Sequence, residues 1–192
     1  TNDLGQDLLS EILYGLRLSL LVGIAAAGLS TAVGAAVGVV AGARRGWIDE
    51  VAMGVTDTLL LIPGLPLLIV LVAYVGAGFW NLILVIGLIW WTSTARAVRA
   101  AALQVATMPY IEAARAAGVS EGRILARHVL PNTLPVILAR FVVAVPEAVL
   151  TEAGLSFLGL GDPRWKSLGL TLHHAFTGGA LLSGAWWWYT FP

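Results

Sequence analysis

The chain has 192 residues, of which 58% are hydrophobic and 11% are charged, and its formal net charge is zero. Soluble domains carry about 25% charged residues, so this composition excludes an ordinary soluble protein and indicates a membrane protein. A net charge of zero gives no basis for nucleic-acid binding, and the absence of cysteine excludes disulfides, thiol catalysis and cysteine-ligated metal sites.

Apolar runs long enough to cross a bilayer, about 20 residues each, recur along the chain. Backbone groups in lipid must bond within their own segment, and no run alternates like a barrel strand, so we predict an all-α polytopic membrane protein. An amphipathic lead-in is expected over residues 1–17, and the membrane domain over 18–192. The expected spans are about 18–43, 51–75, 79–95 and 132–158, with a further span starting from 186.

Two of these spans carry small or helix-breaking residues. Gly34, Gly38 and Gly42 stand four apart in the first span, which lets helix backbones approach closely. The stripe fits either a contact with a partner subunit or packing within this subunit. Pro63 and Pro66 are expected to break or kink the second span.

The longest stretch without membrane character is 110–135, which predicts two short helices with a sharp corner. The loop between the third and fourth spans is expected over 103–131. Thr107 is expected to cap the first helix and Gly118 to end it, because glycine closes a helix at least cost. Ser120 is expected to cap the second helix and Pro131 to stop it.

One face of the first short helix is made of small residues. Ile111, Ala114 and then Ala117 or Gly118 follow helical spacing, which suits a helix lying in a groove on another protein. The alternative is an ordinary helical hairpin between two membrane spans.

The loop resembles the EAA loop of ABC importer membrane subunits. Glu112-Ala113-Ala114, then Gly118, then Leu130-Pro131 carry the resemblance, and the run from Arg127 to Asn132, with its histidine, is similar to the dipeptide, oligopeptide and nickel permease branch. The sequence LSFLGLG at 155–161 is a second match, and residues 1–7 resemble a TDxxGRD segment but depart from it at Asn2 and Gln6. The ATPase-coupling residues implied by the resemblance are Glu112, Ala113, Ala114, Arg115, Gly118, His128, Leu130 and Pro131.

The resemblance implies a type I ABC importer transmembrane domain that, compared with the family, lacks the first span and most of the last. It implies a multi-pass permease subunit of a prokaryotic inner membrane, not an enzyme, importing di- or oligopeptides. The implied partners are a second permease subunit in a heterodimer, two ATPase subunits that bind ATP and Mg, and an extracytoplasmic solute-binding protein. The sequence contains no GxxxxGK[ST] phosphate loop, so no cofactor is expected on this chain.

The basic residues predict the orientation. Placing the loop after the first span on the same side as the coupling loop puts seven basic residues on that side and three on the other, so the coupling loop is expected to be cytoplasmic. The two sets are Arg44, Arg45, Arg96, Arg99, Arg115, Arg123 and Arg127 against Arg17, Arg164 and Lys166.

Four ionisable residues lie at or within the expected spans: Asp57, Arg140, Glu147 and Glu152. Such residues usually face protein or water, so they are candidates for the transport path or for subunit contacts; the alternative is snorkelling or an internal pair. Glu112 and Arg115 are candidates for polar contacts with the ATPase, and for Glu112 a favourable charge in a first helical turn is the alternative. The adjacent His173-His174 lacks a third ligand, and no metal site is expected.

Alternatives remain at this point. The same machinery could import nickel or another small solute, and the histidine-containing branch includes nickel permeases. From a different class, an ion-coupled secondary transporter or channel would also explain spans with prolines and buried charges. A scaffold subunit would explain the spans but neither the loop nor LSFLGLG.

Overall fold

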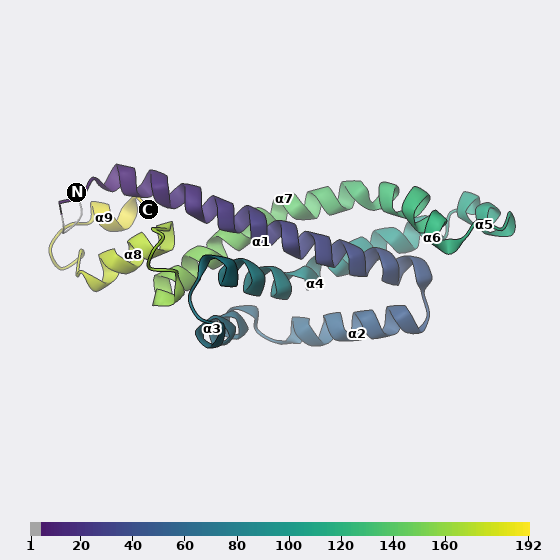
Figure 1. Ribbon diagram of the computed structural model, residues 1–192, viewed down its shortest axis with the longest axis horizontal. Helices are drawn as coiled ribbons and strands as arrows, with labels where there is room; N and C mark the ends of the chain where they lie inside the picture. Colours follow the sequence, from purple (N-terminus) through teal and green to yellow (C-terminus); the bar gives the residue numbers. More distant parts are fainter. Residues whose placement is uncertain (1–4) are drawn as a thin grey trace. The chain divides into compact units, whose positions relative to one another are not determined.

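The computed structural model describes residues 5–192, and this part of the chain is helical with no strand. Residues 1–4 of the TDxxGRD resemblance lie outside the described residues. Figure 1 shows the course of the helices, which are α1 (Leu8–Arg44), α2 (Trp47–Leu61), α3 (Gly64–Val75), α4 (Phe79–Ala106), α5 (Pro109–Ala116), α6 (Glu121–Ile124), the π-helix η1 (Leu125–Val129), α7 (Leu130–Leu155), the π-helix η2 (Ser156–Leu160), α8 (Leu168–Thr177) and α9 (Trp187–Thr190).

Three helical stretches in the described part are long and apolar enough to cross a membrane: Leu8–Arg44, Phe79–Ala106 and Glu121–Leu160. A fourth results if α2 and α3 together form one broken span. The chain is therefore a multi-pass membrane protein with an all-helical fold, as predicted.

The chain divides into two compact units. Of the described residues, unit 1 contains 5–27, 65–86 and 145–192, and unit 2 contains 28–64 and 87–144.

In unit 2, the glycine stripe of α1 packs against the backbone of α4. A Cβ atom added to Gly34 or to Gly38 would lie 2.5 Å from the carbonyl oxygen of Trp91 or Ala95, respectively. A Cβ atom on Gly42 would lie 2.7 Å from the carbonyl oxygen of Arg99. The stripe thus serves packing within this subunit, which is one of the two readings that the sequence left open.

Two ion pairs connect α2 to α4 in the same unit. Arg99 forms a forked pair with Asp49, with Nη2 donating to Oδ2 at 2.6 Å and Nε donating to Oδ1. Arg96 pairs with Asp57 at 2.5 Å. The Arg99 pair is the better shielded, since the Asp49 side chain is 13% exposed and the Asp57 side chain is 58% exposed.

The break between α2 and α3 lies where the prolines predicted one. Ile62 has ψ 128°, an extended conformation, immediately before Pro63. Proline disfavours helical geometry in the residue that precedes it, so α2 ends at Leu61. Pro66 lies inside the first turn of α3, where its missing N–H disrupts nothing.

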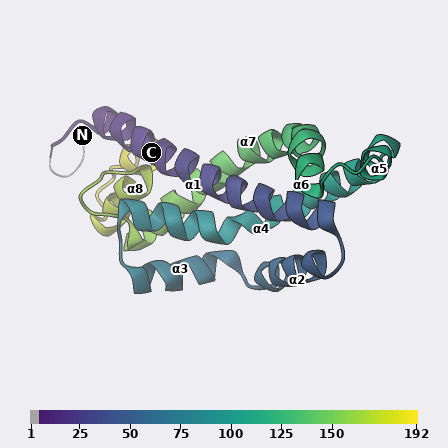
Figure 2. The same ribbon diagram turned by 45° about the vertical axis from the view of Figure 1, so that its right-hand side comes forward.

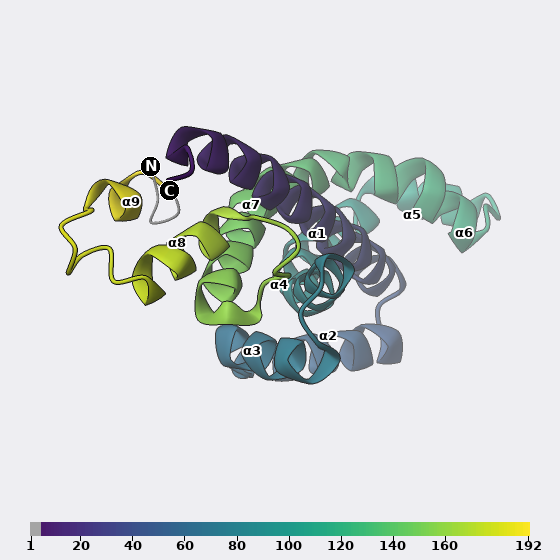
Figure 3. The ribbon, with the colours of Figure 1, turned by 60° about the vertical axis from the view of Figure 1, so that its left-hand side comes forward.

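In unit 1, a buried carboxylate joins α1 to α7. Glu152 is 1% exposed, and its two oxygens accept hydrogen bonds from Ser19 at 2.7 Å and from Ser156 at 2.6 Å. Gly169 lets α8 approach this region closely, since a Cβ there would lie 2.1 Å from the carbonyl oxygen of Ala153. Figure 3 shows α8 close to the end of α7.

The two ends of the described chain also differ in detail from the sequence expectation. The expected lead-in forms no separate element, because α1 is one continuous helix from Leu8 to Arg44. Trp188, near the start of the further span expected from 186, is 3% exposed and packs with Leu8, Ala175 and Ala180 in a small core. The described residues after 186 form the four-residue helix α9.

Candidate functional site

The candidate site is the α4–α7 loop, residues 107–129, which consists of α5, α6 and η1. Figure 2 shows α5 and α6 close to each other, between the end of α4 and the start of α7. Helix α5 begins at Pro109, whose fixed φ suits a first helical position. The expected Thr107 cap is wrong: Met108 occupies the cap position, and the Thr107 hydroxyl donates back to the carbonyl of Gln104 at 2.8 Å.

The end of α5 is closed by glycine, as predicted. Gly118 has φ 77°, and its N–H donates to the carbonyl of Arg115 at 2.9 Å. The N–H of Val119 donates to the carbonyl of Ala114 at 3.1 Å. This pair of bonds is the Schellman motif, which satisfies the last carbonyls and turns the chain sharply.

The second helix begins where Ser120 predicted it, but its expected end at Pro131 is wrong. Ser120 is the cap residue, although its side chain makes no capping hydrogen bond. The helix runs on through η1 into α7, so that Pro131 lies in the first turn of α7. A π-helical turn shifts the hydrogen-bond register by one residue. Pro131 has no N–H, so it donates no backbone hydrogen bond to the preceding turn.

The face of α5 that the sequence offered for docking is turned inward at Ile111 and Ala114. Ile111 is 0% exposed and packs in a core with Val98 and Ala102 of α4, while Ala114 is half-buried against the same core. The branched side chain of Ile111 is the largest apolar group on this helix, so burial within its own chain is favoured. The last positions of that face, Ala117 and Gly118, are exposed, and so are Glu112, Ala113 and Ala116 on the rest of the helix.

The other residues predicted to contact the ATPase are spread over the loop. Gly118, Leu130 and Pro131 are exposed, and His128 is half-buried. The ring of His128 contacts the ring of Tyr110 edge to face, with centroids 5.9 Å apart. The loop thus brings Glu112, Ala113 and Gly118 to the surface, while it turns Ala114 toward the core.

Arg115 is engaged inside the loop. Its Nε donates to Oε1 of Glu121 at 2.8 Å, and Nη1 donates to the carbonyl of Ala106 at 3.4 Å. The Glu121 carboxylate raises the pKa of Arg115, chiefly through this hydrogen bond. The guanidinium therefore stays charged and joins α5 to the end of α4 and the start of α6.

The ionisable residues of the spans occupy different surroundings. Asp57 forms its ion pair with Arg96, and Arg140 donates from Nη2 to the Ser93 hydroxyl at 2.8 Å. Glu147 is half-buried in unit 1, whereas Arg140 belongs to unit 2. Asp57 therefore has an internal partner, which is one of the alternatives that the sequence allowed.

Sequence reasoning missed the residues that hold these charges. Ser156 lies four residues after Glu152, a spacing that places two side chains on one helix face and could have indicated the pair. Ser19 and Asp49 are distant in sequence from Glu152 and Arg99, and no local pattern marks them. His173 hydrogen-bonds the carbonyl of Phe157 at 2.8 Å, and its ring contacts the ring of His174.

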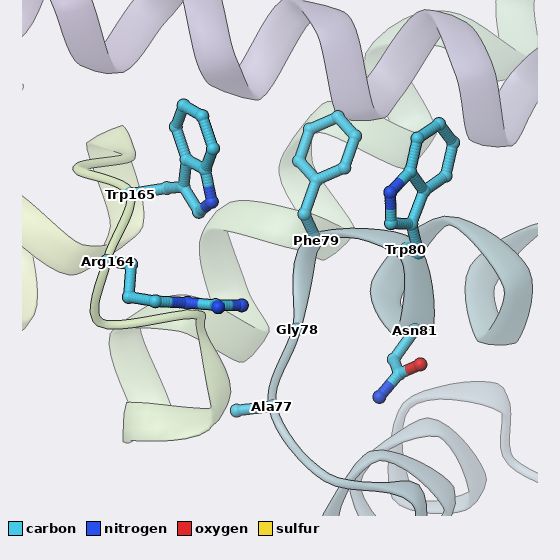
Figure 4. Close-up of a pocket in the computed structure, with 7 residues that line it drawn as sticks. All are labelled: Ala77, Gly78, Phe79, Trp80, Asn81, Arg164 and Trp165. Carbon is cyan, nitrogen blue, oxygen red and sulfur yellow. The ribbon is translucent and has the colours of Figure 1, made fainter.

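Unit 1 carries an open pocket of about 580 Å³ near the α3–α4 turn. Figure 4 shows the Arg164 guanidinium extending toward Ala77 and Gly78, with the rings of Phe79 and Trp165 on one side. Asp162 holds this arginine with hydrogen bonds of 2.9 Å to Nε and 2.7 Å to Nη2. The hydrogen bond from Arg164 lowers the pKa of Asp162 to about 2.

The chain is similar to known permease proteins. It is 35% identical over its whole length to the dipeptide transport system permease protein of Bacillus subtilis, of which it covers 60%. It is 36% identical to the oligopeptide transport system permease protein of Mycobacterium bovis, again over its whole length and covering 66% of that protein. The chain thus spans about three fifths of the length of these relatives.

The fold is similar to that of a solved importer. A chain of the inward-facing MetNI methionine ABC transporter matches with a TM-score of 0.75 over 98% of this chain and 93% of that one, at 20% identity. This likeness shows a type I importer transmembrane fold. A model of the family "Binding-protein-dependent transport system inner membrane component" matches residues 34–188, which include the whole α4–α7 loop. The chain therefore belongs to the family of binding-protein-dependent transport system inner membrane components.

Proposed function

We propose that this chain is part of the transmembrane subunit of an ATP-driven, binding-protein-dependent importer of di- or oligopeptides. The observation that carries the proposal is the α4–α7 loop. Its helix α5 exposes the small residues Ala113 and Ala116 beside the charge of Glu112, while Ile111 anchors the helix in the core. A helix with a small, exposed face fits a groove on a partner protein, which here would be the ATPase subunit.

The packing of unit 2 supports transmission of movement from this helix. The core around Ile111 contains side chains of four other segments, so α5 cannot shift without displacing them. These side chains are Val39 and Ala43 of α1, Val98 and Ala102 of α4, Ile124 of α6 and Val129 of η1. Packed cores change between discrete arrangements and do not deform continuously. Closure of the ATPases would thus move α5 and these helix ends together and switch the spans between inward-open and outward-open states.

The partners follow from the same reading. The sequence has no phosphate-binding loop, so ATP and Mg would be bound by two partner ATPase subunits. A second permease subunit would complete the translocation path in a heterodimer, and an extracytoplasmic solute-binding protein would deliver the substrate at a prokaryotic inner membrane. Peptides are the proposed substrate class because the Bacillus and Mycobacterium relatives are named as dipeptide and oligopeptide permeases.

The test is a cross-link from the exposed face of α5. A cysteine replaces Ala116 in the full-length protein, which is cross-linked in native membranes, and the captured partner is identified by mass spectrometry. A cysteine at Ala106, which is 3% exposed at the end of α4, is the matched control. We expect Ala116→Cys to capture an ATPase subunit and Ala106→Cys to capture none.

The failure to capture an ATPase is informative if the introduced cysteine is accessible. Labelling of the Ala116→Cys variant with a maleimide reagent first tests whether the introduced cysteine is accessible from the cytoplasmic side. If the accessible loop captures no ATPase, the importer proposal is wrong. Ion-driven transport by the permease alone in proteoliposomes then tests the secondary-transporter alternative.

A further inference from the structure

Side chains near both ends of helix α5 contact the neighbouring segments of the chain. Near its end, Arg115 reaches Glu121 of α6 with two hydrogen bonds, of 2.8 Å to Oε1 and 3.4 Å to Oε2. The same guanidinium reaches the carbonyl of Ala106, the last residue of α4. Near its start, the ring of Tyr110 contacts the ring of His128 in η1.

These contacts oppose rotation of α5 about its own axis, a motion that the apolar core opposes only weakly. Ile111 is the one fully buried residue of α5, and the small Ala114 is half-buried against the same core. Two apolar contacts on one side fix the position of a helix but oppose rotation about its axis only weakly. Contacts at the two ends of an eight-residue helix oppose such rotation. A planar guanidinium that binds a carboxylate with two donors also fixes direction, which a lysine would not.

We propose that Arg115 is a positioning residue of the coupling helix, which holds the exposed face of α5 at a fixed angle through Glu121 and the end of α4 and makes no contact with the ATPase. The proposal rests on the function proposed above and reassigns Arg115 within it. Glu112 and the exposed alanines then form the docking face, and Arg115 and Glu121 set its orientation.

The test exchanges the two charges in the full transporter, reconstituted with its ATPase subunits and binding protein. The variants are Arg115→Glu, Glu121→Arg, the double exchange, and Glu121→Gln as a control for the loss of an acidic residue in a first helical turn. The readout is ATP hydrolysis stimulated by the loaded binding protein, divided by the basal rate. This ratio reports coupling and not the amount of folded complex.

We expect each single charge reversal to lower this ratio by about twofold to fivefold, the range that corresponds to an exposed ion pair. The double exchange should restore most of the loss, because it rebuilds the pair with opposite polarity. An Arg115→Glu variant with an unchanged ratio overturns the proposal. So does a double exchange that stays as low as Arg115→Glu, because the arginine would then act on the partner.

A distance measurement separates this proposal from the importer proposal. Spin labels at two exposed positions, Ala116 of α5 and Gln104 of α4, report the spread of α5 orientations in the permease complex without nucleotide. Arg115→Glu should broaden the distance distribution, and the double exchange should narrow it again, whether or not an ATPase binds the loop. A distribution that is equally narrow in all variants contradicts the positioning role even if the cross-link captures an ATPase.

Discussion

The Ser19 hydroxyl donates a hydrogen bond of 2.7 Å to the Glu152 carboxylate, although the two residues are 133 positions apart in the sequence. Ser156 donates to the other carboxylate oxygen, and the N–H of Leu168 reaches the Ser19 oxygen at 3.4 Å. One buried acidic side chain thereby connects α1, α7, η2 and α8 within unit 1. Glu152 thus links these helices by buried hydrogen bonds. This structural role accounts for a costly ionisable group in a membrane-crossing helix.

Replacing Glu152 with alanine should therefore destabilise unit 1. The change leaves the hydroxyls of Ser19 and Ser156 buried without their acceptor, at a cost of about 1–3 kcal/mol. Glu152→Gln retains an acceptor oxygen and should cost less. The measurement is the thermal midpoint of the purified complex, with Thr58→Ala as the control, because that exposed hydroxyl bonds only its own helix at Gly54. A thermal midpoint of Glu152→Ala equal to that of the control would contradict the stabilising role of these hydrogen bonds.

The sequence was sufficient for features that depend on local backbone chemistry. Gly118 closes α5 at positive φ and Pro63 follows the break after α2, because glycine and proline restrict or permit backbone angles wherever they occur. The long apolar helices follow equally from length and composition. The corner of the α4–α7 loop was predictable for these reasons.

The orientation of α5 was not predictable in the same way. Helical spacing placed Ile111 and Ala114 on one face, but spacing does not tell whether a face meets its own chain or a partner. That choice depends on Val98 and Ala102, which only the fold brings near. Pro131 shows a related limit, since nothing in the sequence indicates the π-turn that precedes it and through which the helix continues.

Glycines on α1 give a prediction in which a methyl group has opposite effects at two sites. Gly38→Ala would place Cβ 2.5 Å from the carbonyl oxygen of Ala95, so α1 and α4 must separate. Overpacking of this kind costs about 1–3 kcal/mol. Gly28→Ala in the same helix meets nothing within 4 Å and should be neutral or stabilising by up to about 1 kcal/mol. Thermal unfolding of the two variants, side by side, measures the difference, and equal midpoints would refute the close approach of α1 and α4.

The two ion pairs between α2 and α4 should contribute unequally. Asp49 is largely shielded and binds Arg99 in a forked geometry, so Asp49→Ala should destabilise by about 1–3 kcal/mol. Asp57 pairs with Arg96 at the surface, where the loss should stay below about 1 kcal/mol. Double-mutant cycles for each pair, read by chemical denaturation in detergent, give the two coupling energies. A larger coupling for the exposed pair would contradict the ranking.

Asp162 should make the acid stability of unit 1 depend on pH in a defined window. The bond from Arg164 lowers the pKa of Asp162 from 3.8 to about 2 in the folded protein. The folded state thus binds this proton less readily than the unfolded state, so the stabilisation is complete above about pH 4 and is lost as the pH falls toward 2. Asp162→Asn removes the titrating group, and Arg164→Gln removes the largest cause of its lowered pKa. Thermal midpoints measured from pH 6 to pH 2 should therefore fall less steeply below pH 4 in both variants than in the parent protein. If the parent and both variants lose stability in parallel over this window, the acid sensitivity arises from other carboxylates.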